Sequence, residues 1–311
     1  MSAFVVVNPR SGNGRTVREW KSTAETLEAI YPQMEVAFTE RRGQATQLVR
    51  NALREGHHEI VAVGGDGTIN EAVNGFFDAN GPISPDAVFA FVTSGTGGDF
   101  RKTFGVEAGV DAAIARLGKA AVRAVDIGRV TCISSRGESV TRYFINIASF
   151  GMSGVIVDSV NRARIAKWFG GSFAFAFHST VGALRYRDRT IRLIAGGLDA
   201  ELPISTVAVA NGRYFGGGMM VAPNAAVDDG LFDVIVMGGG SRSETLGDMR
   251  QIYTGDHIKN PNVKVQRATR VVATPVAETK GKPVFIETDG ESAGRLPATF
   301  EILPKALKLR C

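Results

Sequence analysis

Three glycine-rich loops in the first 127 residues constrain the fold of this 311-residue chain more than any other feature. Each loop follows a short β-rich apolar run, and these runs alternate with segments whose apolar residues repeat with a helical period. The alternation predicts a parallel α/β sheet, in which the carboxyl ends of the strands share one edge. The loops would meet at that edge and form a binding cleft. They are residues 8–15, 64–68 and 94–99.

The expected strands of this first region are residues 4–8, 35–39, 60–63 and 88–92, and the expected helices are 16–30, 45–55 and 68–77. After Asp126 the pattern changes to short strands separated by turn residues, which is typical of an antiparallel β-sandwich. These strands are 142–147, 206–210, 231–237, 270–273 and 283–287, interrupted by expected helices at 155–186 and 243–253. The tail, 298–309, reads as a last strand with a turn, and its home domain is left open.

Composition excludes several classes of protein. With 44% hydrophobic and 22% charged residues, the chain can bury a large core, and disorder is excluded. Its 36 basic and 31 acidic residues give a net charge of +5, which favours anionic partners. Cys132 and Cys311 lack disulfide or zinc-site spacing. No basic leader precedes the first strand and no apolar run reaches about 20 residues, so we expect a cytoplasmic protein that at most binds a membrane surface.

The loop at residues 64–68, Gly-Gly-Asp-Gly-Thr, has the form of a phosphate-binding turn. Glycine lets backbone N–H groups approach phosphate oxygens at the start of a helix. A tight turn without a ligand is the alternative, and three such loops at one edge make it the weaker interpretation. A Walker-type loop is absent because no glycine-rich loop ends in Gly-Lys-Ser or Gly-Lys-Thr. The dinucleotide fingerprint also fails at residues 12–14, so the residues predict phosphate binding without the usual NAD motif.

Several motifs together resemble the diacylglycerol-kinase catalytic-domain family, which includes bacterial lipid kinases similar to diacylglycerol, sphingosine and ceramide kinases. Gly-Gly-Asp-Gly-Thr alone would be shared with NAD kinases, and its extension to Gly75 and the C-terminal motifs favour the lipid-kinase branch. The resemblance covers nearly the whole chain. The motifs are residues 8–15, 64–75, 95–100, 211–219, 222–225, 229–233 and 289–291.

The resemblance implies a two-domain fold like that of NAD kinases and diacylglycerol kinases. Residues 1–127 would be an α/β nucleotide-binding domain, 128–296 a β-sandwich domain for the lipid substrate, and 297–311 would return to the first domain. It also implies ATP as the cofactor. The residues expected to bind ATP are Asn8, Arg10, Ser11, Gly12, Thr39, Gly64, Gly65, Asp66, Gly67, Thr68, Glu71, Gly95 and Thr96. One departure is Gly98, where asparagine is commonest, which removes any side-chain hydrogen bond there.

Magnesium is the second cofactor that the resemblance implies, since phosphoryl transfer needs its developing charge neutralised on hard oxygen ligands. Asp66, Asp99 and Asp126 would form a network that reaches ATP-bound Mg²⁺. A further metal site is implied at the turn 225–231, with the Asp229 carboxylate and the backbone carbonyls of Ala226 and Leu231 as ligands. The alternative for that turn is a solvent-exposed β-turn, since Asp-Gly is a common hairpin signal.

Asp289 in the Asp-Gly-Glu motif matches the family's base position, and Glu291 would orient it. A lipid hydroxyl needs a carboxylate in hydrogen-bond reach to accept its proton. A solvated hairpin is the alternative. We therefore expect an ATP- and Mg²⁺-dependent lipid kinase acting on a neutral lipid, with diacylglycerol first and ceramide or a sphingoid base as alternatives. A kinase of a soluble substrate such as NAD, and a nucleotide-binding regulator without turnover, are the rivals.

Residues 162–177 combine basic and aromatic side chains, as do helices that bind anionic bilayer interfaces. The alternative is a helix whose phenylalanines fill a core while its arginines face water. We expect a neutral lipid substrate and an anionic membrane surface as partners, with the protein peripheral at the inner membrane face. Nucleic acid is not expected, because the basic residues are dispersed and no nucleic-acid motif is present. A homodimer is left open.

Overall fold

The computed structural model describes residues 2–93, 98–107, 109–162, 187–238, 251–276 and 283–311. Its chain forms two structural units. Unit 1 comprises Met1–Ile127 and Pro304–Cys311, and unit 2 comprises Gly128–Leu303. The chain passes between the units inside strands β7 (Val122–Ile133) and β17 (Glu291–Arg310). The returning segment starts at Pro304 rather than at residue 297. The reason is that residues 298–301 of β17 still pair with β15 (Arg270–Pro275) in unit 2.

Unit 1 is built on a parallel sheet with the strand order β2, β1, β3, β6 and the end of β17. Its strands are β1 (Ser2–Val7), β2 (Gln33–Phe38), β3 (Glu59–Gly64) and β6 (Val88–Thr93). Every residue of β3 is buried, as expected for a central strand covered on both faces. The predicted α/β class is confirmed for this unit.

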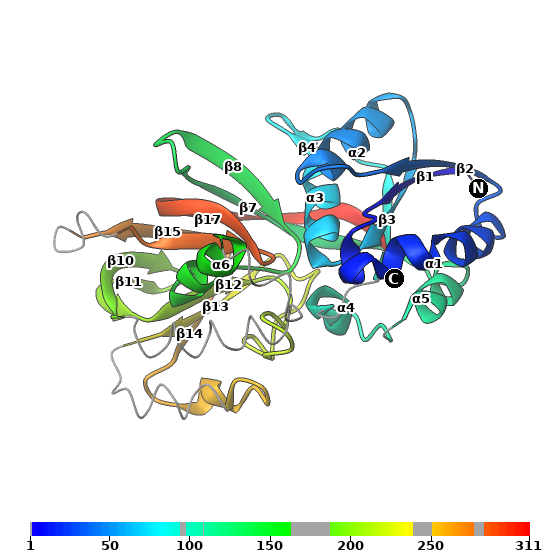
Figure 1. Cartoon of the computed structure of the whole chain (residues 1–311). Coiled ribbons are helices and arrows are strands. Elements are labelled where there is room, and N and C mark those ends of the chain that lie inside the picture. Colours follow the sequence, from blue (N-terminus) through cyan, green and yellow to red (C-terminus); the bar gives the residue numbers. More distant parts are fainter. Residues whose placement is uncertain (1, 94–97, 108, 163–186, 239–250, 277–282) are drawn as a thin grey trace. The chain divides into compact units, whose positions relative to one another are not determined.

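Helices cover both faces of this sheet (Figure 1). They are α1 (Ser11–Glu28), α2 (Gln44–Arg54), α3 (Asp66–Gly75), α4 (Asp99–Thr103) and α5 (Val110–Leu117). Leu27 of α1 and Ile114 of α5 share a core with Val5 and Val61 of the sheet. Helices α2 and α3 pack closely against each other because Gly75 has no side chain: a Cβ there would lie 2.6 Å from Cβ of Val49. The short strands β4 (Phe77–Asp78) and β5 (Gly81–Pro82) follow α3.

The end of the chain is fastened to unit 1 by a buried ion pair. The Arg310 guanidinium donates to both carboxylate oxygens of Glu59, at 2.6 and 2.9 Å, and the Tyr31 hydroxyl donates to the same carboxylate at 2.6 Å. Burial and the neighbouring Glu59 raise the pKa of Tyr31. These bonds satisfy a carboxylate that is only 7% exposed, and removing one partner would leave a buried charge without compensation.

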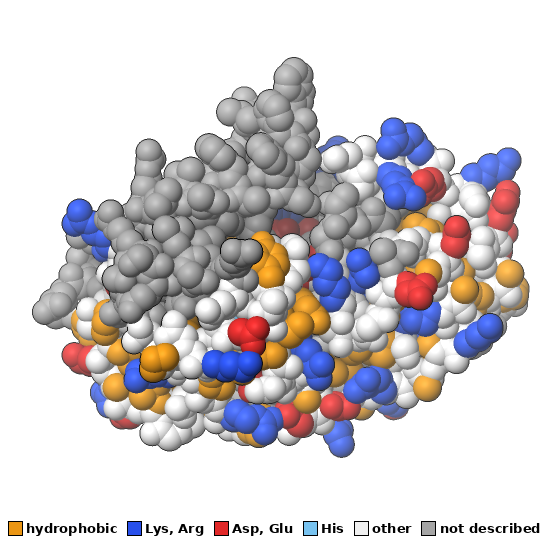
Figure 2. Space-filling model, turned by 90° about the horizontal axis from the view of Figure 1, so that it is seen from below, with side chains coloured by type: hydrophobic (Ala, Val, Ile, Leu, Met, Phe, Trp, Pro, Cys, Tyr) orange, Lys and Arg blue, Asp and Glu red, His pale blue; other side chains and the backbone are white. Residues whose placement is uncertain are grey.

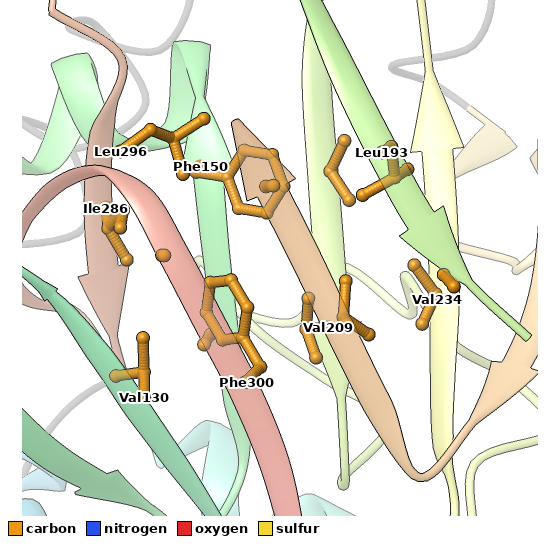
Figure 3. Close-up of a cluster of buried hydrophobic side chains, with 14 of the residues drawn as sticks. Val130, Phe150, Leu193, Val209, Val234, Ile286, Leu296 and Phe300 are labelled. Atoms are coloured by element: carbon orange, nitrogen blue, oxygen red, sulfur yellow. The ribbon is translucent and has the colours of Figure 1, made fainter. Parts of the chain in front are cut away.

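Unit 2 is a β-sandwich of mainly antiparallel strands. One path of paired strands runs β14 (Lys264–Ala268), β13 (Phe232–Met237), β12 (Thr206–Ala210), β9 (Ile147–Gly151), β16 (Phe285–Thr288) and β17. The others are β15, β10 (Arg189–Ala195), β11 (Leu198–Ile204), β7 and β8 (Ser139–Phe144). Side chains from both groups share one core, which Figure 3 shows around Phe150, Phe300 and Val209. The predicted sandwich is confirmed.

Unit 2 differs from the sequence prediction at one strand, and two of its predicted helices lie partly or mostly outside the described residues. The predicted strand 142–147 is two strands, β8 and β9, separated by a bend at residues 145–146. Of the predicted helix 155–186, the structure describes α6 (Met152–Arg162), which lies against β9 and β16. Residues 163–186, and most of the predicted helix 243–253, lie outside the described residues.

Candidate functional site

The first two glycine-rich loops meet at the end of the unit 1 sheet. Asn8 follows β1, and residues 64–68 lead from β3 into α3. The Asn8 side-chain amide donates to the Thr68 hydroxyl at 3.0 Å and so joins the loops. Gly64 is needed for this arrangement, because a Cβ there would lie 2.5 Å from Oγ1 of Thr68. Gly65 caps α3 in an extended conformation, and Gly67 lies in the first turn.

The loop after Asn8 turns through three consecutive residues with positive φ: Gly12 at 58°, Asn13 at 56° and Gly14 at 81°. Glycine and asparagine are the residues that adopt this conformation at least cost. Asn8 also fixes this turn, because its side-chain oxygen accepts the N–H of Arg10 at 3.0 Å and its carbonyl accepts the Ser11 hydroxyl at 2.9 Å. Asn8 is therefore a common anchor for two of the three predicted phosphate loops.

Glu71 has a structural task that the sequence did not predict. Its carboxylate accepts the N–H groups of Gly43 at 2.7 Å and Ala45 at 3.2 Å, and so caps the N-terminus of α2 from the neighbouring helix α3. These bonds fix the turn after Thr39, whose own N–H donates to the Val7 carbonyl at 2.9 Å. Both carboxylate oxygens of Glu71 are thus used to hold this turn, and its expected contact with ATP stays a prediction.

Asp66 and Asp99 lie close together at the N-termini of α3 and α4. The Asp99 N–H donates to Oδ2 of Asp66 at 3.4 Å, and Lys102 contacts the Asp99 carboxylate at 3.2 Å. Asp126 is fully buried, and its Oδ1 accepts the Lys305 N–H at 2.7 Å, which ties the returning segment to β7. No three His, Cys, Asp or Glu side chains among the described residues form a group that could hold a metal. The expected network of Asp66, Asp99 and Asp126 around ATP-bound Mg²⁺ stays a prediction.

Asp66 and Asp99 stay the predicted ligands of ATP-bound Mg²⁺, which is usually held by one or two carboxylates with the other ligands supplied by phosphates and water. Asp66 and Asp99 are the residues that would hold it. Gly95 and Thr96 lie outside the described residues. Gly98 has φ of 59°, in the left-handed region that glycine and asparagine tolerate, which explains why glycine can stand where asparagine is commonest.

The turn of the predicted second metal site is closed by donors of the protein itself. Oδ1 of Asp229 accepts the Leu231 N–H at 3.0 Å, and Oδ2 accepts a hydrogen bond from the Arg267 guanidinium. Both oxygens of the expected carboxylate ligand are engaged by donors of the protein itself, one of them cationic. The metal-ligand role of Asp229, with the backbone carbonyls of Ala226 and Leu231, stays a prediction, and no chemical step is assigned to it.

Asp289 organises the backbone of unit 2. With Gly290 it forms the turn between β16 and β17, and both residues have positive φ, 49° and 83°, as in a two-residue hairpin. Its carboxylate accepts the N–H groups of Ile145, Asn146 and Ile147 at 3.0 to 3.1 Å. These three bonds are the physical reason why the predicted strand 142–147 bends. The segment is thus a hairpin, as the alternative interpretation expected. Its Asp289 carboxylate, however, is bonded to backbone N–H groups of the protein.

Glu287, two residues earlier, was not predicted as a site residue. Its buried carboxylate accepts the Gly290 N–H at 2.8 Å and bonds the Ser149 hydroxyl, which bonds the Ser153 hydroxyl of α6 at 2.8 Å. Gly154 lets α6 approach this closely, since a Cβ there would lie 2.1 Å from the Phe285 carbonyl. Burial raises the pKa of Glu287 to about 7, with Asp289 adding to the effect while its two hydrogen bonds oppose it. A carboxyl in an apolar strand was the only available sequence signal.

Family models match both parts of the chain. The diacylglycerol kinase catalytic domain matches residues 2–130, and the YegS C-terminal NAD kinase beta sandwich-like domain matches residues 146–311. The chain belongs to the diacylglycerol kinase family. It is accordingly an enzyme, a kinase. None of the described helices is long and apolar enough to span a bilayer.

The similarity to known members of the family extends over nearly the whole chain. It is 26% identical to a diacylglycerol kinase of Mycobacterium tuberculosis over 98% of this chain and 93% of the relative. It is 27% identical to one of Staphylococcus haemolyticus over 99% and 87%. A crystal structure of a diacylglycerol kinase from Bacillus anthracis str. Sterne has a TM-score of 0.71 at 21% identity, covering 99% and 96%. Yeast NADH kinase complexed with NADH has a TM-score of 0.52 at 10% identity, covering 100% and 82%, and shares the fold.

Proposed function

We propose that this kinase transfers the γ-phosphoryl group of ATP to the hydroxyl of a neutral lipid, with diacylglycerol as the first substrate and ceramide or a sphingoid base as alternatives. The observation that carries the proposal is the hydrogen bond from Asn8 to Thr68, which joins two phosphate-type loops in a member of the diacylglycerol kinase family. The names of the curated relatives support diacylglycerol.

Unit 1 supplies the ATP-binding groups in this proposal. The glycine-rich loops at residues 12–14 and 64–68 bind the phosphates, and the N-terminus of α3 adds its partial positive charge. Asp66 and Asp99 would hold Mg²⁺, which neutralises charge on the transferred phosphoryl group when bound. Gly95 and Thr96 complete the proposed nucleotide contacts.

The turn of Asp289 and Glu291 supplies the proton acceptor. Asp289 matches the family's base position, but its carboxylate already accepts three backbone N–H groups, so both of its oxygens are occupied within the protein. We therefore assign proton acceptance from the lipid hydroxyl to Glu291 and assign to Asp289 the positioning of the turn and of residues 145–147.

Turnover and nucleotide binding of Glu291→Gln and Asp289→Asn test this assignment. Loss of a general base typically costs about 10²–10⁴-fold in rate. We expect that loss in Glu291→Gln, with ATP affinity and thermal stability unchanged. Asp289→Asn should lose stability together with activity. Normal turnover in Glu291→Gln would refute the role of Glu291, and an inactive but fully stable Asp289→Asn protein would restore Asp289 as the base.

A membrane surface is the proposed place of action, since a long-chain lipid leaving a bilayer loses about 0.8 kcal/mol per buried CH₂ group. The net charge of +5 supports contact with anionic lipid. On the face in Figure 2, Lys and Arg side chains are spread over the described surface with Asp and Glu among them. The expected basic-aromatic segment 162–177 lies almost wholly outside the described residues, and its membrane contact stays a proposal.

A further inference from the structure

Two arginines hold the turn 225–231, and one of them, Arg267, occupies the carboxylate expected to bind a metal ion. Arg267 donates to the carboxylate of Asp229, and Nε of Arg213 donates to the backbone carbonyl of Ala225 at 2.9 Å. The second oxygen of Asp229 closes the turn on the Leu231 N–H at 3.0 Å. A carboxylate and a backbone carbonyl are the oxygen types that hard cations bind. In this turn a guanidinium occupies the carboxylate, and the second guanidinium holds the carbonyl of Ala225, the residue before the expected ligand Ala226.

The sheet fixes the position of Arg267. Arg267 of β14 pairs directly with Asp233 of β13 in the antiparallel ladder, and its Nε lies 4.0 Å from Oδ1 of Asp233. Its backbone is also packed, because a Cβ at Gly196 would lie 2.6 Å from the Arg267 carbonyl. Asp233 is only 3% exposed, and burial raises the pKa of its carboxyl while the neighbouring Arg267 opposes that effect. Arg267 therefore stands between two carboxylates, those of Asp229 and Asp233.

We propose that Arg267 is the resident cation of this turn and stabilises it without a divalent metal. A guanidinium presents several N–H donors and stays charged at every physiological pH, so it serves carboxylate oxygens well. Because Arg267 belongs to the adjacent strand, its guanidinium is present at Asp229 at a high effective concentration. A metal ion from solution must compete with it. A divalent ion at Asp229 would also repel the guanidinium. The metal requirement of this kinase would then lie with ATP alone.

Thermal unfolding of the full chain, without nucleotide, tests the proposal in EDTA and over a series of Mg²⁺ and Ca²⁺ concentrations. For the wild type we expect no stabilisation by either ion that depends on Asp229. Arg267→Ala should unfold about 2–4 °C lower in EDTA, as for a loss of one moderate ion pair in a chain of this size. Saturable rescue by a divalent ion in that variant, absent from Arg267→Ala/Asp229→Asn, would show that the arginine stands where a cation is needed.

Arg270→Ala is the matched control, since Arg270 is an exposed arginine near β14 whose partner is Glu301 at 3.8 Å. It should show no rescue by divalent ions. Arg267→Lys keeps a cation, so divalent ions should not change its thermal unfolding. This variant keeps the proposal testable if the alanine variant does not fold. Saturable stabilisation of the wild type that disappears in Asp229→Asn would overturn the proposal. So would an Arg267→Ala protein that matches the wild type in EDTA.

Discussion

Replacing Glu287 by glutamine should make the protein more stable at neutral and alkaline pH, although the glutamate makes two hydrogen bonds. Glutamine has nearly the same shape and no charge. Its carbonyl oxygen can accept the Gly290 N–H, and its amide can donate to the Ser149 hydroxyl, which turns to accept. The network that joins β16 to α6 through Ser153 would then persist without a buried charge.

The magnitude follows from the pKa, which burial raises from its usual 4.5 to about 7. In the unfolded chain the carboxyl ionises near 4.5, so between these values the folded state binds a proton that the unfolded state has lost. This bound proton stabilises the folded state fully below about pH 4.5, and the stabilisation is lost as the pH rises through about 7. Since one pKa unit corresponds to about 1.4 kcal/mol, ionising Glu287 in the folded protein costs roughly 3 kcal/mol above pH 7.

Urea unfolding of the wild type and Glu287→Gln at pH 5, 6, 7 and 8 measures this cost. The difference in unfolding free energy should grow with pH in favour of the variant and level off near pH 8, because all other groups titrate equally in both proteins. Glu138→Gln, at an exposed glutamate in the turn between β7 and β8, should show little change at any pH. A difference that stays constant with pH, or a variant less stable than the wild type at pH 8, would refute the reasoning.

Two glycines give further predictions. Gly64→Ala should lower the unfolding free energy by about 1–3 kcal/mol and weaken ATP binding, because the added Cβ lies 2.5 Å from Thr68; calorimetric titration with ATP measures the binding, and unchanged affinity would place the nucleotide elsewhere. Gly98→Asn should be tolerated better than Gly98→Val by about 1 kcal/mol or more, because asparagine adopts φ of 59° more readily; equal melting temperatures of the two variants would contradict this.

The fold was accessible from the sequence where the signal is local. The apolar runs of β1, β3 and β6 and the glycine loops after them predicted the parallel sheet and its loop-bearing edge, because strand burial and positive φ both restrict residue type at the position itself. The bend between β8 and β9 was not predicted. It is caused by Asp289, which lies 142 to 144 residues away from the N–H groups that it binds.

The candidate site shows the same limit. Asp289 and Glu291 were found through a motif, but the motif does not say which carboxylate is occupied by backbone donors. Glu287 was missed because its raised pKa depends on burial under α6, which no local pattern reveals. The contact of Asp229 with Arg267 was not predicted, because it arises only through the pairing of β14 with β13. In each case a tertiary contact decides the chemistry of a residue whose type the sequence already gives.

The most direct measurement of the proposed function is transfer of label from γ-³²P-ATP by the purified full chain to a panel of acceptors with Mg²⁺. Diacylglycerol, ceramide and a sphingoid base would be presented in mixed micelles, and NAD in solution. The account predicts a labelled lipid, diacylglycerol first, at a rate that falls about 10²–10⁴-fold in Glu291→Gln. Labelled NAD with no labelled lipid, from the same preparation, would contradict it.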